Sequence, residues 1–222
     1  ARFMASNLGL IERGPFRRYQ TGQVFRGENP QRGRWREFTQ FDFDSVGPIN
    51  SAEDPKEDAL IIEAAIKCVR ALGLNEAIMA VNHRARFSGI PVEVIRAFDK
   101  LNKIGMDGVK KEITENGYSD QDFEKFKYLF TTGKEKAILN DLFTELRKRG
   151  LTEERDFIFD PSLARGLDYY TGVIFELRPS ADPKELSIGG GGRYDDLIGM
   201  FAKKGIPAVG FSFGLDRLLE IA

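Results

Sequence analysis

Two runs of charged and aromatic residues carry side chains suited to phosphate and amine recognition. The first extends from Phe25 to Asp44. Within it, Arg26 can neutralise a phosphate and Glu28 can accept a hydrogen bond from an amine. Gln40 and Asp44 are spaced to share one face of a strand, where together they can bind an ammonium group. The alternative interpretation is cross-strand ion pairing on a solvated sheet face.

The second run begins at Arg165, which precedes a glycine where the chain can bend toward a bound molecule. Strand parity places three polar side chains on one face: Asp168, Tyr170 and Glu176. The same parity predicts that the other face packs on the core through Tyr169, Val173, Phe175 and Leu177. A row of tyrosine and carboxylate groups suits an imidazole, which needs both a donor and an acceptor. The alternative is an aromatic core strand with one salt bridge.

Two glycine-containing patterns follow. The first is Gly189–Gly192, which precedes Arg193, Tyr194 and Asp195. No Gly-Lys-Ser/Thr follows and the spacing is not that of a dinucleotide fingerprint, so by itself the pattern favours a flexible turn. The second, residues 210–219, reads as a strand entering a helix. It places Arg217 in the first helical turn, where a bound phosphate would suit both the arginine and the helix dipole. The alternative is a surface arginine paired with Asp216 or Glu220.

The elements that must position these residues are predicted from hydrophobic periodicity and turn signals. A helix is expected near residues 54–73, a mostly helical block over 91–157, and a last helix from Gly214. Strands are expected at Tyr19–Glu28, Phe38–Val46, Ala77–Val81, Leu167–Leu177, Leu186–Gly192 and Ala208–Phe213. The order predicts an α+β fold, with an antiparallel sheet interrupted by a helical insertion.

Composition narrows the class of protein. The 222 residues are 41% hydrophobic and 30% charged, with a formal net charge of -1. No apolar run approaches the roughly 20 residues that span a bilayer, and Cys68 has no cysteine partner. We therefore expect a cytoplasmic protein with no membrane association. One histidine (His83) and one cysteine do not make a zinc site.

These four patterns, in this order, resemble the catalytic core of class II aminoacyl-tRNA synthetases of the histidyl type. The first resembles class II motif 2 and the last resembles motif 3. The run from Arg165 to Tyr170 and the glycine run with Arg193-Tyr194-Asp195 resemble the two signatures peculiar to the histidyl type. The resemblance implies a class II synthetase-type antiparallel sheet flanked by helices. It also implies a division into a first core part (1–85), a helical insertion domain (86–157) and a second core part (158–222).

The resemblance implies activation of histidine with ATP and transfer to tRNA(His). It assigns Arg26 and Arg165 to the α-phosphate and the histidine carboxylate, and Glu28 to the adenine. Mg²⁺ would bridge the phosphates, with no protein ligand assigned. The remaining roles that it implies are the β- and γ-phosphates for Arg36 and Arg217, the histidine amino group for Gln40 and Asp44, the imidazole for Tyr170 and Tyr194, and a further histidine contact for Tyr169.

Parts of the family pattern are not present in the sequence. Motif 1 and a threonine-bearing loop belong upstream, and an anticodon-binding domain belongs downstream. We therefore expect a fragment or an incomplete chain, with a homodimer for the full-length protein. One alternative is a non-catalytic paralogue such as the regulatory subunit of ATP phosphoribosyltransferase, and another is a domain that senses uncharged tRNA. The four arginines at positions 26, 36, 165 and 217 favour the enzyme.

Overall fold

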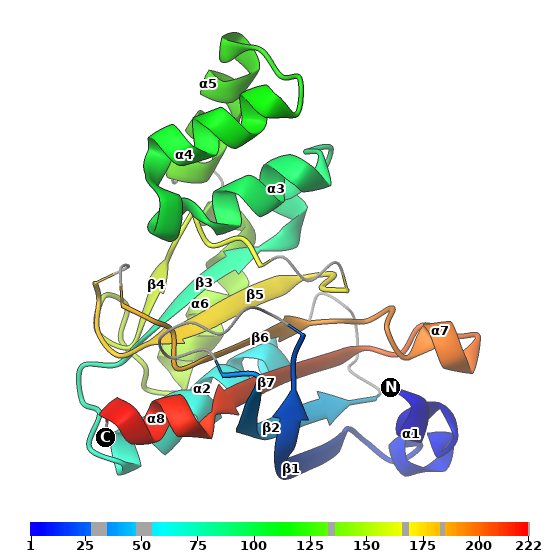
Figure 1. Ribbon diagram of the computed structural model, residues 1–222. Coiled ribbons are helices and arrows are strands. Elements are labelled where there is room, and N and C mark those ends of the chain that lie inside the picture. Colours follow the sequence, from blue (N-terminus) through cyan, green and yellow to red (C-terminus); the bar gives the residue numbers. More distant parts are fainter. Residues whose placement is uncertain (28–34, 48–54, 133–135, 166–168, 183–184, 222) are drawn as a thin grey trace.

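The centre of the molecule is a seven-stranded sheet (Figure 1). The computed structural model describes residues 1–27, 35–47, 55–132, 136–165, 169–182 and 185–221. The strands are β1 (Phe16–Phe25), β2 (Glu37–Val46), β3 (Ile78–His83), β4 (Phe157–Phe159), β5 (Val173–Arg178), β6 (Gly189–Arg193) and β7 (Ala208–Gly214). Their order is β1-β2-β7-β6-β5-β3-β4, and every pairing except the parallel β3–β4 pair is antiparallel. The predicted α+β class is confirmed.

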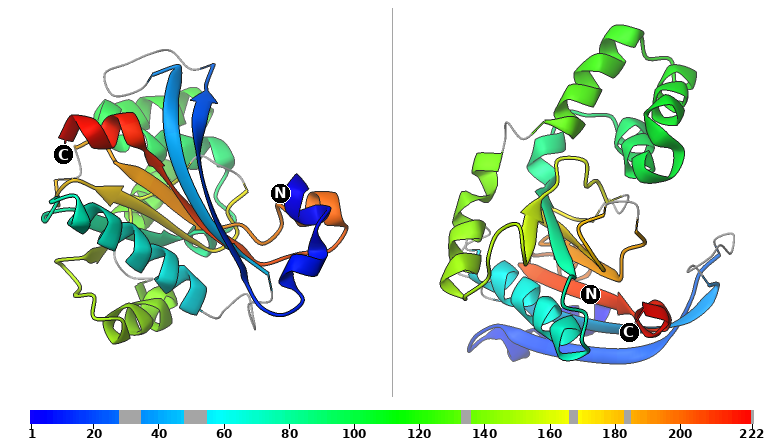
Figure 2. Two further views of the ribbon diagram at one scale, coloured as in Figure 1. Left: turned by 90° about the horizontal axis from the view of Figure 1, so that it is seen from below. Right: turned by 90° about the vertical axis from the view of Figure 1, so that its left-hand side faces the viewer.

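Helices cover the sheet unevenly. They are α1 (Arg2–Ala5), α2 (Lys56–Ala71), α3 (Val92–Asp99), α4 (Leu101–Glu115), α5 (Asp120–Thr131), α6 (Asn140–Lys148), α7 (Gly199–Ala202) and α8 (Leu215–Ile221). Short 3-10 helices are η1 (Leu8–Ile11), η2 (Arg84–Phe87) and η3 (Lys136–Leu139). The helices α3, α4 and α5 gather away from the sheet, as Figure 2 shows, and we call them the helical lobe. Among the described residues, no helix is long and apolar enough to cross a membrane.

Alternation along the strands separates the core from the open face of the sheet. On β2, Phe41 and Phe43 pack against the main hydrophobic cluster, which joins the sheet to α2 and α6. Gln40, Asp42 and Asp44 lie on the other face, as the alternation predicts. The same rule holds on β5, where Val173, Phe175 and Leu177 are all in that cluster.

The predicted helical block divides between two clusters. Side chains of α6, including Leu142 and Phe143, belong to the main cluster under the sheet. The helical lobe instead forms a second cluster around Phe98 and Phe130, whose rings stack with centroids 4.0 Å apart. Treating residues 86–157 as one insertion domain therefore stays a prediction.

The glycine run, Gly189–Gly192, separates two sequence expectations. The strand expected at Leu186–Gly192 is confirmed as β6, between β5 and β7, whereas the flexible turn that the glycine pattern favours by itself is wrong. None of these four glycines has a positive φ. They are needed for space: a Cβ at Gly191 would sit 2.0 Å from the Gly210 carbonyl oxygen, and one at Gly189 would sit 2.5 Å from the Ser212 carbonyl oxygen. A run of glycines by itself favours a turn because glycine has a flexible backbone. The sequence pattern does not show how closely the neighbouring strands approach.

A buried ion pair joins α2 to the end of β6. Arg193 and Asp58 are both buried, and Arg193 Nη2 lies 3.0 Å from Asp58 Oδ2. Arg193 Nε donates to both carboxylate oxygens at 3.2 Å. The pair holds the helix under the strand that carries the glycines.

Removing Asp58 tests this connection. Asp58→Ala leaves a buried guanidinium without its main counter-charge, and we expect a loss of about 3 kcal/mol or more in the free energy of unfolding. Urea titration followed by circular dichroism measures it. Lys67→Ala is the control, because it breaks only the exposed Lys67–Glu63 pair and should cost about 1 kcal/mol or less. A loss below about 1 kcal/mol for Asp58→Ala would show that the buried pair does not hold α2 in place.

Candidate active site

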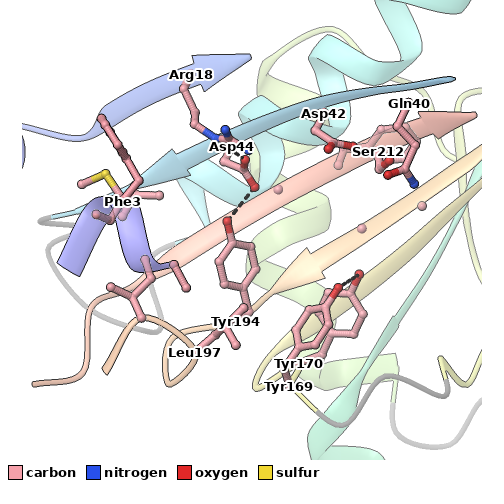
Figure 3. A pocket seen from close by; sticks show the side chains of 18 of the residues that line it. Phe3, Arg18, Gln40, Asp42, Asp44, Tyr169, Tyr170, Tyr194, Leu197 and Ser212 are labelled. Atoms are coloured by element: carbon pink, nitrogen blue, oxygen red, sulfur yellow. Dashed lines mark hydrogen bonds and ion pairs between the residues drawn. The ribbon is translucent and has the colours of Figure 1, made fainter. Parts of the chain in front are cut away.

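A cavity of about 450 Å³ opens on the face of the sheet opposite α2 (Figure 3). That size is within the range of small-molecule sites. Seven of the residues predicted from sequence line it: Arg26, Gln40, Asp44, Arg165, Tyr169, Tyr170 and Tyr194. They come from the end of β1, from β2 and from the segments flanking β5 and β6, so residues far apart in the chain meet on one sheet face. The lining also includes side chains that the sequence motifs did not single out: Phe3, Met4, Arg18, Leu197, Ile198 and Ser212.

Asp44 is held by two neighbours. Tyr194 donates its hydroxyl to Asp44 Oδ1 at 2.6 Å, and Arg18 Nε donates to Asp44 Oδ2 at 2.9 Å (Figure 3). Burial raises the pKa of Tyr194, and the charge of Asp44 raises it further. The tyrosine is therefore a protonated donor at neutral pH. Arg18 was missed because it stands outside every recognised motif, although strand register places it directly opposite Asp44.

Tyr169 and Tyr170 both face the cavity. Their ring centroids are 4.5 Å apart and their hydroxyl oxygens 3.4 Å apart. Tyr194 meets the Tyr169 ring edge-on, with centroids 6.1 Å apart. The prediction that Tyr169 packs inward on the core is wrong. β5 begins only at Val173, so strand parity does not extend back to Tyr169.

Arg165 lies against the backbone of β6. A Cβ at Gly190 would come within 1.6 Å of its Nη1 atom, and a Cβ at Gly192 within 2.7 Å of the Tyr170 ring. Arg165 Nη1 donates a long hydrogen bond to the Phe175 carbonyl at 3.5 Å, and Glu176 lies 4.0 Å from it. The guanidinium thus has weak partners and faces the cavity. The glycines of β6 act by allowing these two side chains to approach the sheet.

Asp42 and Ser212 are an unusual pair at the centre of the cavity floor. They face each other across β2 and β7, and Gly190 continues the same row on β6. Within the described part of the chain, Asp42 Oδ1 and Ser212 Oγ are buried without a hydrogen-bond partner, and Asp42 has no ion pair. Burial raises the pKa of Asp42, the facing Ser212 hydroxyl lowers it, the charge of Asp44 raises it, and the charges of Arg18 and Arg26 lower it. Among the described residues no cation forms a direct ion pair with this buried carboxylate, so its burial is only partly compensated.

Arg26 lines the cavity from a position just past the end of β1. Its guanidinium stacks over the Phe38 ring at 4.5 Å, and its backbone N–H donates to the Arg36 carbonyl at 2.8 Å. The ring fixes the side chain without neutralising its charge. The charge therefore remains available to an anion in the cavity.

Two predicted residues, Arg36 and Arg217, are not brought together with the others. Arg36 is exposed and Arg217 donates to the Ser187 carbonyl, and neither lines the cavity. Glu28 lies outside the described residues. Across the described ranges, no group of three or more His, Cys, Asp or Glu side chains is placed to hold a metal ion.

Comparison with known proteins decides the family. A sequence model described as histidyl-tRNA synthetase matches residues 120–218. The histidine–tRNA ligase of Aeropyrum pernix is 38% identical over 99% of this chain, and that of Flavobacterium johnsoniae is 39% identical over 98%. The chain belongs to the histidyl-tRNA synthetase catalytic-domain family of class II aminoacyl-tRNA synthetases.

Solved structures agree with that assignment. The crystal structure of histidyl-tRNA synthetase from Nostoc sp. PCC 7120 matches 98% of this chain with a TM-score of 0.81 and 28% identity. A Bacillus halodurans protein described as an ATP phosphoribosyltransferase regulatory subunit/histidyl-tRNA synthetase matches with a TM-score of 0.73 and 23% identity, which supports the fold alone. The chain spans about half of these relatives: 54% of the Aeropyrum protein, 51% of the Flavobacterium protein and 56% of the Nostoc chain.

Proposed function

We propose that this chain carries the site at which a histidine–tRNA ligase activates histidine with ATP. The observation that carries the proposal is the composition of one cavity. Its lining combines the arginines Arg26 and Arg165 with the acidic face of β2 and with three tyrosines. Family membership supports the use of ATP and an amino acid.

The tyrosine side suits the imidazole of histidine. An imidazole needs a donor for one nitrogen and an acceptor for the other. Tyr170 and Tyr169 supply hydroxyls that can do either, and Tyr194 with Asp44 supplies a fixed polar pair. Because burial also raises the pKa of Tyr169, its hydroxyl stays protonated and can donate. An amino acid with an apolar side chain would leave these groups unpaired, which gives selectivity.

The amino group of histidine is assigned to β2. Asp44, the carboxylate predicted for this role, already has Arg18 and Tyr194 as partners. Asp42 has a buried oxygen without a hydrogen-bond partner and no ion pair among the described residues, so we add it to Gln40 and Asp44 as the main anionic partner of the ammonium group. Burying the Asp42 carboxylate without a full set of partners costs folding free energy, and the ammonium group of bound histidine would supply the missing partner.

The phosphate side would carry the reaction. The histidine carboxylate oxygen attacks the α-phosphorus in line, a new C–O–P linkage forms, and the bond to the β-phosphate oxygen breaks to release pyrophosphate. Arg165 and Arg26 would hold the charge that develops on the α-phosphate oxygens, so the protein contributes position and charge. Mg²⁺ would arrive with ATP. Arg36 and Arg217 would reach the outer phosphates only after their side chains turn, and Glu28 stays a predicted adenine partner.

The same proposal extends to the whole protein. Histidyl-adenylate would be attacked by the terminal adenosine hydroxyl of tRNA(His), and the helical lobe would contact the acceptor arm. A homodimer and a cytoplasmic location are expected for the full-length enzyme. The proposal also includes the division of the chain into a first core part (1–85), a helical insertion domain (86–157) and a second core part (158–222).

A non-catalytic histidine-binding paralogue is the second candidate. Its support is the fold similarity to the Bacillus halodurans protein. Such a paralogue would bind histidine without consuming ATP. The cavity arginines Arg26 and Arg165 favour the enzyme, and one assay separates the two.

Substituting Arg165 tests the enzyme directly. We expect Arg165→Ala to lower histidine-dependent ATP–pyrophosphate exchange about 100-fold or more, because the transition-state charge loses a positioned donor. Melting temperature and circular dichroism should be unchanged. Arg147→Ala, which removes an exposed arginine on α6, is the matched control and should exchange at the wild-type rate. Near-normal exchange in Arg165→Ala would refute the role of Arg165, and no exchange in the wild type, with histidine still bound, would favour the paralogue.

Asp42 links binding to stability. A carboxyl whose pKa is raised by folding stabilises the fold below its unfolded pKa and loses that contribution as the pH rises through the folded pKa. At pH 7 the ionised Asp42 therefore costs stability, and Asp42→Asn should raise the melting temperature. The same change should raise the KM for histidine roughly tenfold, through loss of a charge-assisted contact.

The control for Asp42 is Asp107→Asn on an exposed position of α4, which should change neither quantity by much. Thermal melts at pH 7 and pyrophosphate exchange at varied histidine concentration measure both. An unchanged KM for histidine in Asp42→Asn would contradict the proposal that Asp42 binds the ammonium group of histidine.

A further inference from the structure

Arg86 bridges the helical lobe and the segment that leads to Arg165. It is buried in η2, directly after β3. Its Nη2 atom donates to the Leu129 carbonyl at 2.8 Å and to the Thr132 carbonyl at 3.1 Å, both at the C-terminal end of α5. Its Nη1 atom donates to the Pro161 carbonyl at 3.2 Å. One guanidinium therefore binds two stretches of backbone that are far apart in sequence.

Asn82 reinforces the second of these attachments. It is fully buried on β3, and its Nδ2 atom donates to the Leu163 carbonyl at 2.9 Å and the Pro161 carbonyl at 3.3 Å. Its Oδ1 atom accepts from Arg86 Nη1 at 3.1 Å. The chain is thus fixed four and two residues before Arg165, by side chains that also contact each other.

Apolar packing follows the same connection. Leu163 and Ala164, immediately before Arg165, belong to the hydrophobic cluster of the helical lobe, together with Phe98 and Phe130. Tyr170 belongs to that cluster as well. Leu163, Ala164 and Tyr170 therefore pack with the cluster of the lobe and not with the main cluster under the sheet.

An arginine is well suited to this position. The last carbonyls of a helix have no partners within the helix, and a cation near them is favoured by the helix dipole. The planar fork of Arg86 reaches two such carbonyls with one nitrogen while the other nitrogen faces the opposite way, toward Pro161. The Phe159 ring lies 5.0 Å from the guanidinium and shields it from water. Lysine keeps the charge but has no fork.

We propose that Arg86 is a positioning residue for Arg165, which it ties to the end of α5 so that the catalytic arginine keeps its place only while the lobe is docked. The inference rests on the proposed function. A shift of the lobe, such as one caused by an RNA bound to it, would be transmitted to Arg165 through Pro161 and Leu163. Arg86 itself does not line the cavity and does not contact the reacting atoms.

A double-mutant cycle on pyrophosphate exchange tests the proposal. Arg86→Lys should lower kcat about tenfold, with the KM for histidine and for ATP changed less than about twofold, because Arg165 acts on the transition state. In an Arg165→Lys background, Arg86→Lys should cause no further loss, since coupled residues are not additive. Equal losses in both backgrounds would show that Arg86 does not act through Arg165.

Hydrogen exchange supplies a readout that does not depend on activity. In Arg86→Lys, peptides covering residues 158–165 and the end of α5 should exchange faster, while the β1–β2 hairpin should be unchanged. Lys100→Met, which breaks an ion pair with Glu112 inside the lobe, is the control and should leave residues 158–165 protected. Unchanged protection of residues 158–165 in Arg86→Lys would overturn the proposal, whether or not the protein exchanges pyrophosphate.

Asn82→Asp gives a second variant if Arg86→Lys does not fold. It keeps the acceptor for Arg86 and removes both Nδ2 donors to the segment before Arg165. The same split between kcat and KM and the same loss of protection are expected. A variant with wild-type kcat and wild-type protection would contradict the proposal.

Discussion

Arg165 and Tyr170 lie against the backbone of β6 at Gly190 and Gly192, and the rest of the site depends on this close approach. Any side chain at either glycine would overlap the guanidinium or the ring. The opposite face of the same strand is equally crowded, because Phe175 and Phe211 press against Gly191 and Gly189. The four glycines of β6 thus leave only the backbone of the strand between the hydrophobic core and the charged cavity. Glycine loses more conformational entropy on folding than other residues, and the close packing on both faces of β6 offsets this cost.

Charge is distributed across the cavity in rows set by strand register. Arg18, Asp44 and Tyr194 form one group, in which both carboxylate oxygens of Asp44 and the Tyr194 hydroxyl have a partner. Asp42 and Ser212, in the next row, are left with unpartnered buried oxygens among the described residues. The two groups differ in what they can still bind. Asp44 already has hydrogen-bond partners and fixes the geometry of its neighbours, whereas Asp42 keeps an oxygen that can accept a hydrogen bond from a ligand. This difference supports a ligand-binding role for Asp42, which the spacing of the sequence did not reveal.

The sequence predicted features that depend on neighbouring residues in the chain, and it missed those that depend on close contacts between distant segments. Alternation on β2 correctly separated Phe41 and Phe43 from the acidic face, because a half-buried strand imposes a period of two. The glycine motif by itself favoured a turn, although the surrounding segment was expected to be a strand. The four glycines are needed because neighbouring strands and side chains lie so close, and a single-sequence pattern does not record that proximity. Tyr169 was assigned to the core because parity was extended beyond the start of β5. Arg18 and Arg86 carry no motif signal, and only tertiary contacts identify them.

The central claim is that bare backbone on β6 is what allows Arg165 to serve the phosphate side of the cavity. Gly190→Ala tests it most directly, with histidine-dependent pyrophosphate exchange as the measurement and a thermal melt alongside. The added Cβ would displace the guanidinium, so kcat should fall at least about tenfold while the folded structure and the KM for histidine are retained. Wild-type exchange by a folded Gly190→Ala protein would contradict the account.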